Sequence, residues 1–217
     1  KRGFPAQQMI VNLIPSQLIT VRIIMKFYSL SILVLLFINS MACAPLITQS
    51  PNEGLSPVNA VSVDDDKHLF LFGHDVVSYF QEDTHKLGKA SIKSTYKDVT
   101  FWFSSHEHKV LFYKEPSKYI PQFGGYCANG IAYGIPWGGN ADTWKIIDNK
   151  LYIFGGQSSQ DAFLVNSKEN ISLAHEYWEN EVKDSNAFFQ RSWRLAWRVP
   201  HYKTGKELAE LVEKSKN

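Results

Sequence analysis

Residues 101–128 constrain the possible folds more than any other part of the chain, because several kinds of local structure follow one another within them. Phe101 and Phe103 alternate with other residues, which is typical of a half-buried strand. Ser104 or Ser105 can then cap a helix that runs to about Lys114. We expect the apolar residues 110–112 to face inward from this helix.

The second half of this segment predicts a tight turn and an elbow. Pro116 and Pro121 bound a turn that carries Tyr119. Two glycines at 124–125 permit positive φ or close backbone approach, and Cys127 stands directly after them. The glycines leave the approach to Cys127 open, so its thiol is a candidate reactive group or metal ligand.

The flanking sequence predicts an α+β fold of small antiparallel β-hairpins packed with short helices, followed by C-terminal helices. Residues 94–103 form one hairpin with its turn at 97–98, and residues 143–154 form a second with its turn at 148–149. The last third is helical: Ser167 can cap one helix, and Thr204 with Glu207 forms a capping box before another. Aromatic residues at 189, 193 and 197 form a stripe that we expect to pack on the core, with a position at a membrane interface as the alternative.

The N-terminal residues indicate export. Residues 25–43 have the layout of a signal peptide, with Lys26 before the apolar run 30–38, and residues 1–24 are interpreted as an over-extended start. Cys43 follows small residues, so it is a candidate for lipid attachment, with ordinary signal cleavage as the alternative. We therefore expect a periplasmic protein or a membrane-anchored lipoprotein of a bacterial cell envelope. Residues 44–57 form a linker.

Charge and cysteine content limit the partners. The formal net charge is +2 and the basic residues are scattered, so we expect no nucleic-acid partner. The chain has two cysteines. If Cys43 carries lipid, Cys127 is the lone thiol of the mature protein; otherwise a disulfide between them is formally allowed in an oxidising compartment. No protein partner is indicated.

Two motifs carry a family resemblance: residues 73–80 read GHDVVSYF and residues 121–128 read PQFGGYCA. With the spacing of the aromatic and proline residues between them, they resemble the YHS-domain family, in particular its secreted form. The resemblance covers about residues 69–152, which places a YHS-like domain at 58–155 and a helical extension at 156–217. It implies a small α+β unit that is often described as metal-binding and recurs beside proteins that handle copper and other heavy metals. Some secreted relatives are described as selenoproteins, and no substrate is implied.

The chain departs from the compact metal-binding relatives at a cysteine pair. Aligned on Lys109 and Phe112, these cysteines fall on Ser104 and His108. Serine is a poor ligand for soft metals, whereas histidine is a good one. The predicted set for copper or zinc is therefore Cys127 with His108, and with His106 and His74 as further candidates.

Each of these residues also has a structural interpretation. Cys127 can be a small buried apolar residue. His106 and His108 point in different directions on a helix and can be exposed polar residues. His74 stands where the family often has tyrosine, which indicates an aromatic ring near a backbone group, and Asp75 is better interpreted as a helix cap than as a catalytic acid.

Three functions follow from the sequence. The first is an exported metal-binding protein, in which case the protein is not an enzyme. The second is a redox protein whose Cys127 thiol forms a sulfenic acid or a mixed disulfide. The third is a structural or partner-binding protein of the envelope without chemistry of its own. No catalytic triad order, HExxH motif or phosphate-binding glycine loop is present.

Overall fold

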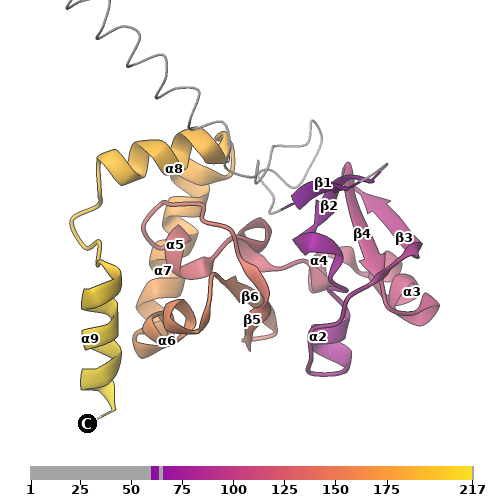
Figure 1. Ribbon diagram of the computed structural model, residues 1–217, viewed down its shortest axis with the longest axis horizontal. Helices are drawn as coiled ribbons and strands as arrows, with labels where there is room; N and C mark the ends of the chain where they lie inside the picture. Colours follow the sequence, from indigo (N-terminus) through magenta and orange to yellow (C-terminus); the bar gives the residue numbers. More distant parts are fainter. Residues whose placement is uncertain (1–59, 64–65, 217) are drawn as a thin grey trace, which may run out of the picture. The chain divides into compact units, whose positions relative to one another are not determined.

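A mixed four-stranded sheet forms the N-terminal part of the computed structural model, which describes residues 60–63 and 66–216 (Figure 1). The strand order across the sheet is β1 (Ala60–Val63), β2 (Asp66–Phe70), β4 (Val99–Phe103) and β3 (Lys89–Tyr96). β1 pairs antiparallel with β2, and β3 pairs antiparallel with β4. β2 and β4 are parallel neighbours, so the two antiparallel pairs are joined edge to edge.

Both predicted hairpins are confirmed. In the first, the turn between β3 and β4 has positive φ at Lys97 (48°) and Asp98 (62°). In the second, β5 (Asn140–Ile147) and β6 (Lys150–Phe154) are antiparallel, and the turn residues Asp148 and Asn149 have φ of 49° and 58°. Positive φ at two central residues is the backbone geometry whose twist matches that of the flanking strands.

The predicted helix after β4 is also confirmed, as α3 (His106–Lys114). Of the two serines, Ser105 is the cap, because its Oγ accepts a hydrogen bond from the His108 N–H at 3.1 Å. The prediction that residues 110–112 all face inward is wrong for Val110, which is 52 % exposed, whereas Phe112 is buried. Consecutive helical residues point about 100° apart, so three in a row cannot share one face.

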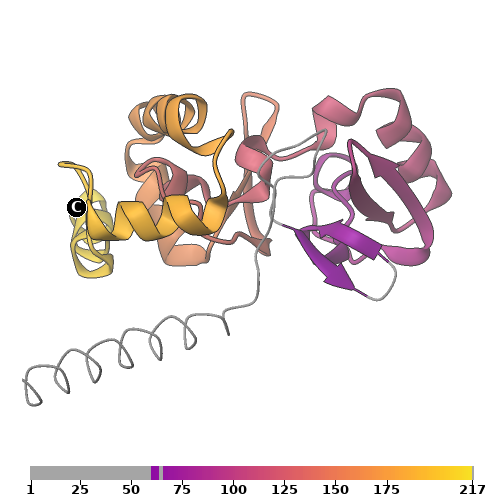
Figure 2. The ribbon, with the colours of Figure 1, turned by 90° about the horizontal axis from the view of Figure 1, so that it is seen from above.

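Phe112 is the centre of the first hydrophobic core. Its ring centroid lies 4.7 Å from that of Phe101 and 5.2 Å from that of Phe103, so α3 packs directly on β4 (Figure 2). Tyr119 from α4 (Pro116–Tyr119) joins the same core, and its ring stands edge-on to Phe80. Two short helical turns follow β2, η2 (Leu71–Gly73) and α2 (Ser78–Gln81), and they contribute Leu71 and Tyr79 to this core.

Strand β6 is buried on both faces and joins two cores. Leu151 and Ile153 belong to the first core, whereas Tyr152 and Phe154 belong to a second. This alternation follows from the two-residue repeat of a strand. The other buried residues of the second core come from residues 123–132, before β5, and from residues 163–187, after β6.

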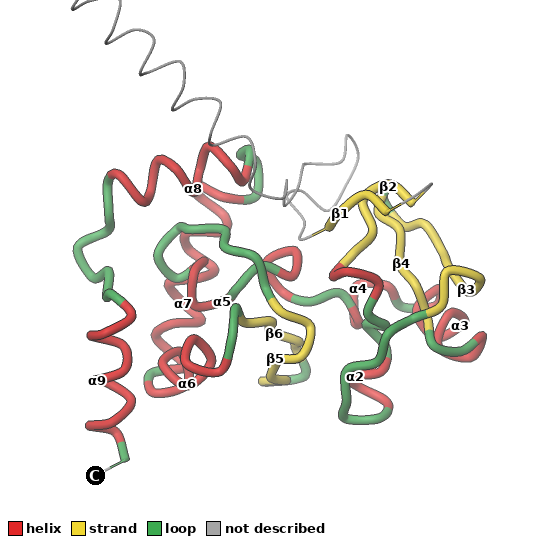
Figure 3. Tube along the Cα trace, in the orientation of Figure 1, coloured by secondary structure: helices red, strands yellow, loops and turns green. Residues whose placement is uncertain are grey.

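Helices dominate after β6 (Figure 3). The helical elements from residue 122 onward are η3 (Gln122–Gly125), α5 (Ala128–Ile131), α6 (Gln157–Val165), α7 (Ser167–Tyr177), the π-helical turn η4 (Trp178–Val182), α8 (Ala187–Ala196) and α9 (Gly205–Ser215). Phe163 of α6 and Ala174 of α7 are buried in the second core.

The two predicted helix caps have different outcomes. The capping box is present: the Thr204 N–H donates to Glu207 Oε2 at 2.7 Å, and the Glu207 N–H donates to Thr204 Oγ1. Ser167 is instead the first residue of α7, and its neighbour Asn166 makes no side-chain cap. The prediction for Ser167 is therefore wrong.

The architecture is α+β, as predicted, and the described residues belong to one compact unit. The predicted signal peptide at 25–43, the lipid-attachment residue Cys43 and the linker 44–57 lie outside the described residues. Among residues 60–63 and 66–216, no helix has the length and apolar character needed to cross a membrane.

Candidate functional site

Cys127 is held in place by backbone contacts on two sides. Its N–H donates to the Trp137 carbonyl at 2.8 Å, and it forms an isolated parallel bridge with Ile153 of β6. The residue is only 2 % exposed. The position of the thiol is therefore fixed by the same strand that joins the two cores.

The glycine elbow before Cys127 adopts the positive φ expected of it. Gly124 and Gly125 have φ of 59° and 77°, and Phe123 has φ of 57°, which is uncommon for a residue with a side chain. All three residues are buried. The elbow thus turns the chain inside the protein, and the expectation that these glycines open the approach to Cys127 is wrong.

A pocket of about 610 Å³ opens beside Cys127. Cys127 lines it together with Phe72, Trp137, Gly138, Gly139, Asn140, Gly155, Gly156, Gln157, Ser158 and Ser159. Two of these glycines stand where a side chain would meet close neighbours. A Cβ on Gly139 would lie 2.5 Å from the Gly125 carbonyl oxygen, and a Cβ on Gly155 would lie 3.6 Å from the Cys127 Sγ. Gly139 therefore permits close backbone packing, and Gly155 leaves the space beside the sulfur open.

The start of helix α6 forms another wall of the pocket. Ser159 Oγ lies 3.1 Å from Cys127 Sγ, and either atom can be the donor. The N-cap residue Gly156 makes no side-chain cap. The first N–H groups of a helix have no acceptor within the helix, and they favour a negatively charged or carbonyl oxygen nearby. Gln157 and Ser158, the first two helical residues, both line the pocket.

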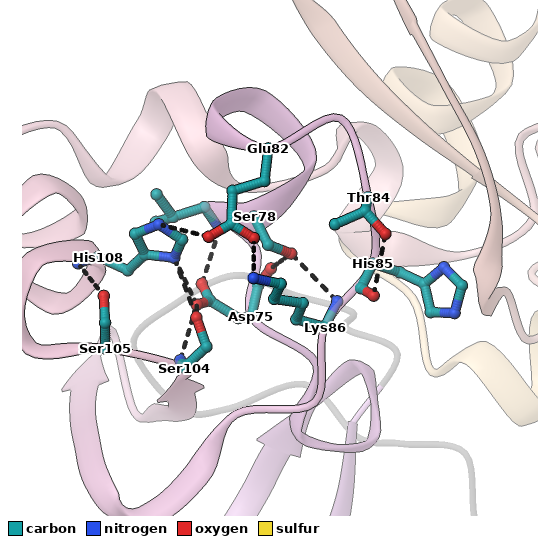
Figure 4. A network of polar contacts seen from close by, with 10 residues as sticks. Asp75, Ser78, Glu82, Thr84, His85, Lys86, Ser104, Ser105 and His108 are labelled. Atoms are coloured by element: carbon teal, nitrogen blue, oxygen red, sulfur yellow. Dashed lines mark hydrogen bonds and ion pairs between the residues drawn. The ribbon is translucent and has the colours of Figure 1, made fainter.

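His108 lies in a different environment, a buried polar network around Asp75 (Figure 4). His108 Nδ1 is 2.7 Å from Asp75 Oδ2, and the same oxygen accepts hydrogen bonds from the Ser104 N–H and the Ser104 hydroxyl, each at 2.7 Å. Asp75 is fully buried, and His108 is 6 % exposed. The other ring nitrogen of His108 lies 3.8 Å from Glu82 Oε1, so the imidazole stands between two carboxylates.

Asp75 also fulfils part of the helix-capping role that the sequence predicts for it. Its Oδ1 accepts a hydrogen bond from the Val77 N–H at 3.0 Å, while Val77 itself is the N-cap residue of α2. Asp75 thus caps the turn before the helix and at the same time anchors Ser104 and His108 through its other oxygen. The network links the α2 region to the start of α3.

His106 and His74, the other two predicted ligands, do not line the Cys127 pocket either. His106 is exposed, whereas His108 is buried, so the two do diverge as predicted. His74 Nδ1 lies 3.1 Å from the Leu71 carbonyl oxygen, in agreement with a ring held near a backbone group. Burial lowers the pKa of His74, and the neighbouring His85 acts in the same direction. The ring centroids of His74 and His85 are 6.0 Å apart.

The predicted metal ligands are not gathered around one point in the described part of the chain. Among residues 60–63 and 66–216, no group of three or more His, Cys, Asp or Glu side chains is placed to hold a metal ion. His108 is bound to Asp75, His74 to Leu71, and none of the three predicted histidines lines the Cys127 pocket. The residues that do surround the sulfur are hydroxyl, amide, aromatic and glycine residues.

Several pocket residues were not predicted from the sequence. Ser159 and the pair Gly155-Gly156 lie about 30 residues along the chain from Cys127, and Trp137 lies in the loop before the second hairpin. A signal for them existed, because the second hairpin is flanked by two Gly-Gly pairs, at 138–139 and 155–156. A hairpin that both begins and ends in paired glycines brings two stretches without side chains side by side.

Comparison of the chain with protein-family models, with curated proteins and with solved structures gives no match. The resemblance to the YHS-domain family rests on the motifs around Asp75 and Cys127.

Proposed function

We propose that this protein is a thiol-dependent redox protein in which a small molecule enters the pocket and reacts with Cys127. The observation that carries the proposal is the position of the sulfur. Cys127 lines a pocket of about 610 Å³, although the residue is only 2 % exposed. A thiol in such a place is shielded from macromolecules and open to a compound that fits the pocket.

The chemistry is thiol–disulfide exchange with a small disulfide. The Cys127 thiolate attacks one sulfur of the incoming disulfide, the disulfide bond breaks, and the second half leaves as a thiolate. Cys127 is thereby oxidised to a mixed disulfide, and the leaving thiol carries the electron pair. The thiolate of a second small thiol then attacks the bound half of the substrate, a new small disulfide forms, and Cys127 leaves as a thiolate. An external thiol is needed because Cys127 is the one free cysteine among the described residues.

The pocket walls favour a substrate with both an apolar and an anionic part. Trp137 and Phe72 provide aromatic surface on the lining. The start of α6 provides N–H groups that suit a carboxylate or carbonyl oxygen. The Ser159 hydroxyl, 3.1 Å from the sulfur, can donate a hydrogen bond to the Cys127 thiolate or to the leaving thiolate.

The test compares reaction rates of the native thiol with a small and a bulky alkylating reagent. We expect Cys127 to react with the small reagent without unfolding and to exclude the bulky one. Gly155→Ala should slow the small reagent, because the new methyl group would stand 3.6 Å from the sulfur at an ordinary contact distance. Gly205→Ala is the matched control, since nothing lies within 4 Å of a Cβ there.

Two results would count against the proposal. One is a Gly155→Ala protein that reacts as fast as the wild type while retaining its stability. The other is a reaction rate that rises with denaturant in proportion to global unfolding, because the pocket would then give no access to Cys127. Cys127→Ser, which keeps a hydroxyl in place of the thiol, sets the background rate.

Metal binding and export remain predictions from the sequence. Elemental analysis of wild type and Cys127→Ser checks the first, and equal metal content in both would exclude Cys127 as a ligand. Lipid at Cys43 is checked by the mass of the mature protein isolated from membranes.

A further inference from the structure

Helix α8 presents its apolar face away from the protein. Phe189, Trp193 and Trp197, which we call the α8 stripe, are 70 %, 52 % and 59 % exposed. They follow one another at intervals of four residues and so share one side of the helix. The rings of Trp193 and Trp197 are stacked, with centroids 4.3 Å apart. The prediction that this stripe packs on the core is therefore wrong.

The side of α8 that carries Gln190 and Arg194, about 100° around the helix from Phe189 and Trp193, faces the protein. Gln190 Nε2 donates to the Gly134 carbonyl at 3.2 Å and to Glu181 Oε2 at 3.0 Å. Arg194 forms an ion pair with Glu181, and its guanidinium carbon lies 5.6 Å from the centroid of the Tyr177 ring. A surface helix ordinarily turns its polar side to water. In this orientation the large aromatic side chains of the stripe stay unburied, which marks a binding surface.

The segment that carries the stripe is rich in basic residues. From Ser185 to Lys206 the sequence contains Arg191, Arg194, Arg198, Lys203 and Lys206 and no Asp or Glu. Arg191 and Arg198 lie over the aromatic rings of Phe188 and Tyr202, at 5.9 Å and 4.7 Å. Arg194 is paired with Glu181, whereas Arg191 and Arg198 form no ion pair in the described part of the chain. A segment that combines exposed tryptophans with such cations is complementary to an anionic surface.

We propose that α8 and Trp197 dock on an anionic lipid surface, with the stripe at the level of the headgroups. At 10 residues, α8 is too short to span a bilayer and is suited to lie along one. Tryptophan is the side chain that prefers this interfacial region, since its ring is apolar and its N–H is polar. A second copy of the chain is a poorer partner, because Arg191 and Arg198, which flank the stripe, would then face the same cations of the other copy.

Binding to vesicles tests the proposal with the full chain. The probes are phosphatidylglycerol vesicles and phosphatidylcholine vesicles, and the readout is the fraction of protein that sediments with each. The variants are Trp193→Ser with Trp197→Ser, and separately Arg191→Gln with Arg198→Gln. Tyr113→Ser, which removes an 80 % exposed aromatic ring on α3, is the matched control. Each variant carries the same residues 1–59, so differences between variants report on α8.

We expect stronger binding to phosphatidylglycerol than to phosphatidylcholine, weakened by salt. The double tryptophan variant should lose about tenfold or more in partition, since two half-exposed indoles leave the bilayer. The arginine variant should lose its preference for the anionic vesicles, and Tyr113→Ser should bind as the wild type. Equal binding of wild type and tryptophan variant would overturn the proposal. A change in oligomeric state on tryptophan replacement, without a change in vesicle binding, would overturn it in favour of a second copy.

Discussion

Replacing Asp75 by asparagine should remove the strongest polar anchor of the first core. The Asp75 carboxylate is fully buried and faces four donors: the N–H groups of Val77 and Ser104, the Ser104 hydroxyl, and His108 Nδ1. Asparagine has nearly the same shape, so the change leaves no cavity. It replaces one acceptor oxygen by an NH₂ group that meets donors and cannot accept from them.

The size of the effect follows from these contacts. The oxygen that faces Val77 can be kept, but Oδ2, which serves Ser104 twice and His108 once, is lost. A buried donor that loses its acceptor costs about 1–3 kcal/mol, and more where the acceptor was a carboxylate. We expect Asp75→Asn to lower the free energy of unfolding by about 4 kcal/mol, a large share of the total for a domain of this size.

Urea unfolding followed by circular dichroism measures this loss. Asp142→Asn is the control, because Asp142 is exposed and makes the same chemical change at the surface. Its free energy of unfolding should change by less than about 0.5 kcal/mol. The dependence of free energy on urea should stay the same in both variants, since the surface exposed on unfolding does not change.

A loss below about 1 kcal/mol for Asp75→Asn would refute the reasoning. It would mean that the donors around Asp75 find other acceptors or water at no great cost. A double-mutant cycle with His108→Gln then separates the contributions. If the changes at Asp75 and His108 simply add, the 2.7 Å contact between them has no energetic significance.

Three further predictions concern other parts of the fold. Phe112→Ala should lower the free energy of unfolding by about 3–5 kcal/mol in urea titrations, because the ring contacts two other buried rings in the first core. Ser105→Ala should cost about 1 kcal/mol in the same assay, through loss of the hydrogen bond that caps α3. Burial, and then the nearby Lys150, lowers the pKa of His175 below its usual 6.5, so stability should be full above that pH and fall as the pH drops through the lowered pKa. Urea unfolding at neutral and acidic pH should show a smaller decrease for His175→Gln than for the wild type.

The locally determined features of the fold could be predicted from the sequence. Both hairpin turns, the helix that follows Ser105 and the capping box at Thr204 depend on residues within a few positions of one another. The α+β class follows from these elements. The parallel pairing of β2 with β4 could not be predicted, because it joins strands about 30 residues apart that no local pattern relates.

The candidate site could be predicted only in part, for a related reason. Cys127 was recognised from its motif, but its surroundings come from the far end of the second hairpin, at Gly155 and Ser159. His108 was assigned to a metal because the sequence does not show that Asp75 lies against its ring. The prediction for α8 was wrong for a different reason. An amphipathic pattern shows which side of a helix is apolar, but it does not show what covers that side.

The thiol pocket and the Asp75 network should be separable by experiment, although β6 connects the cores beside them. Cys127 is fixed by Trp137 and Ile153, whereas Asp75 fixes Ser104 and His108. Under native conditions, Asp75→Asn should therefore lower stability and leave the alkylation rate of Cys127 unchanged. Gly155→Ala should lower the alkylation rate of Cys127 and leave stability unchanged, because its methyl group fits without displacing backbone and only covers the sulfur. If both variants changed both quantities, Cys127 would be reached by opening of the first core, and the pocket would not be the route to the thiol.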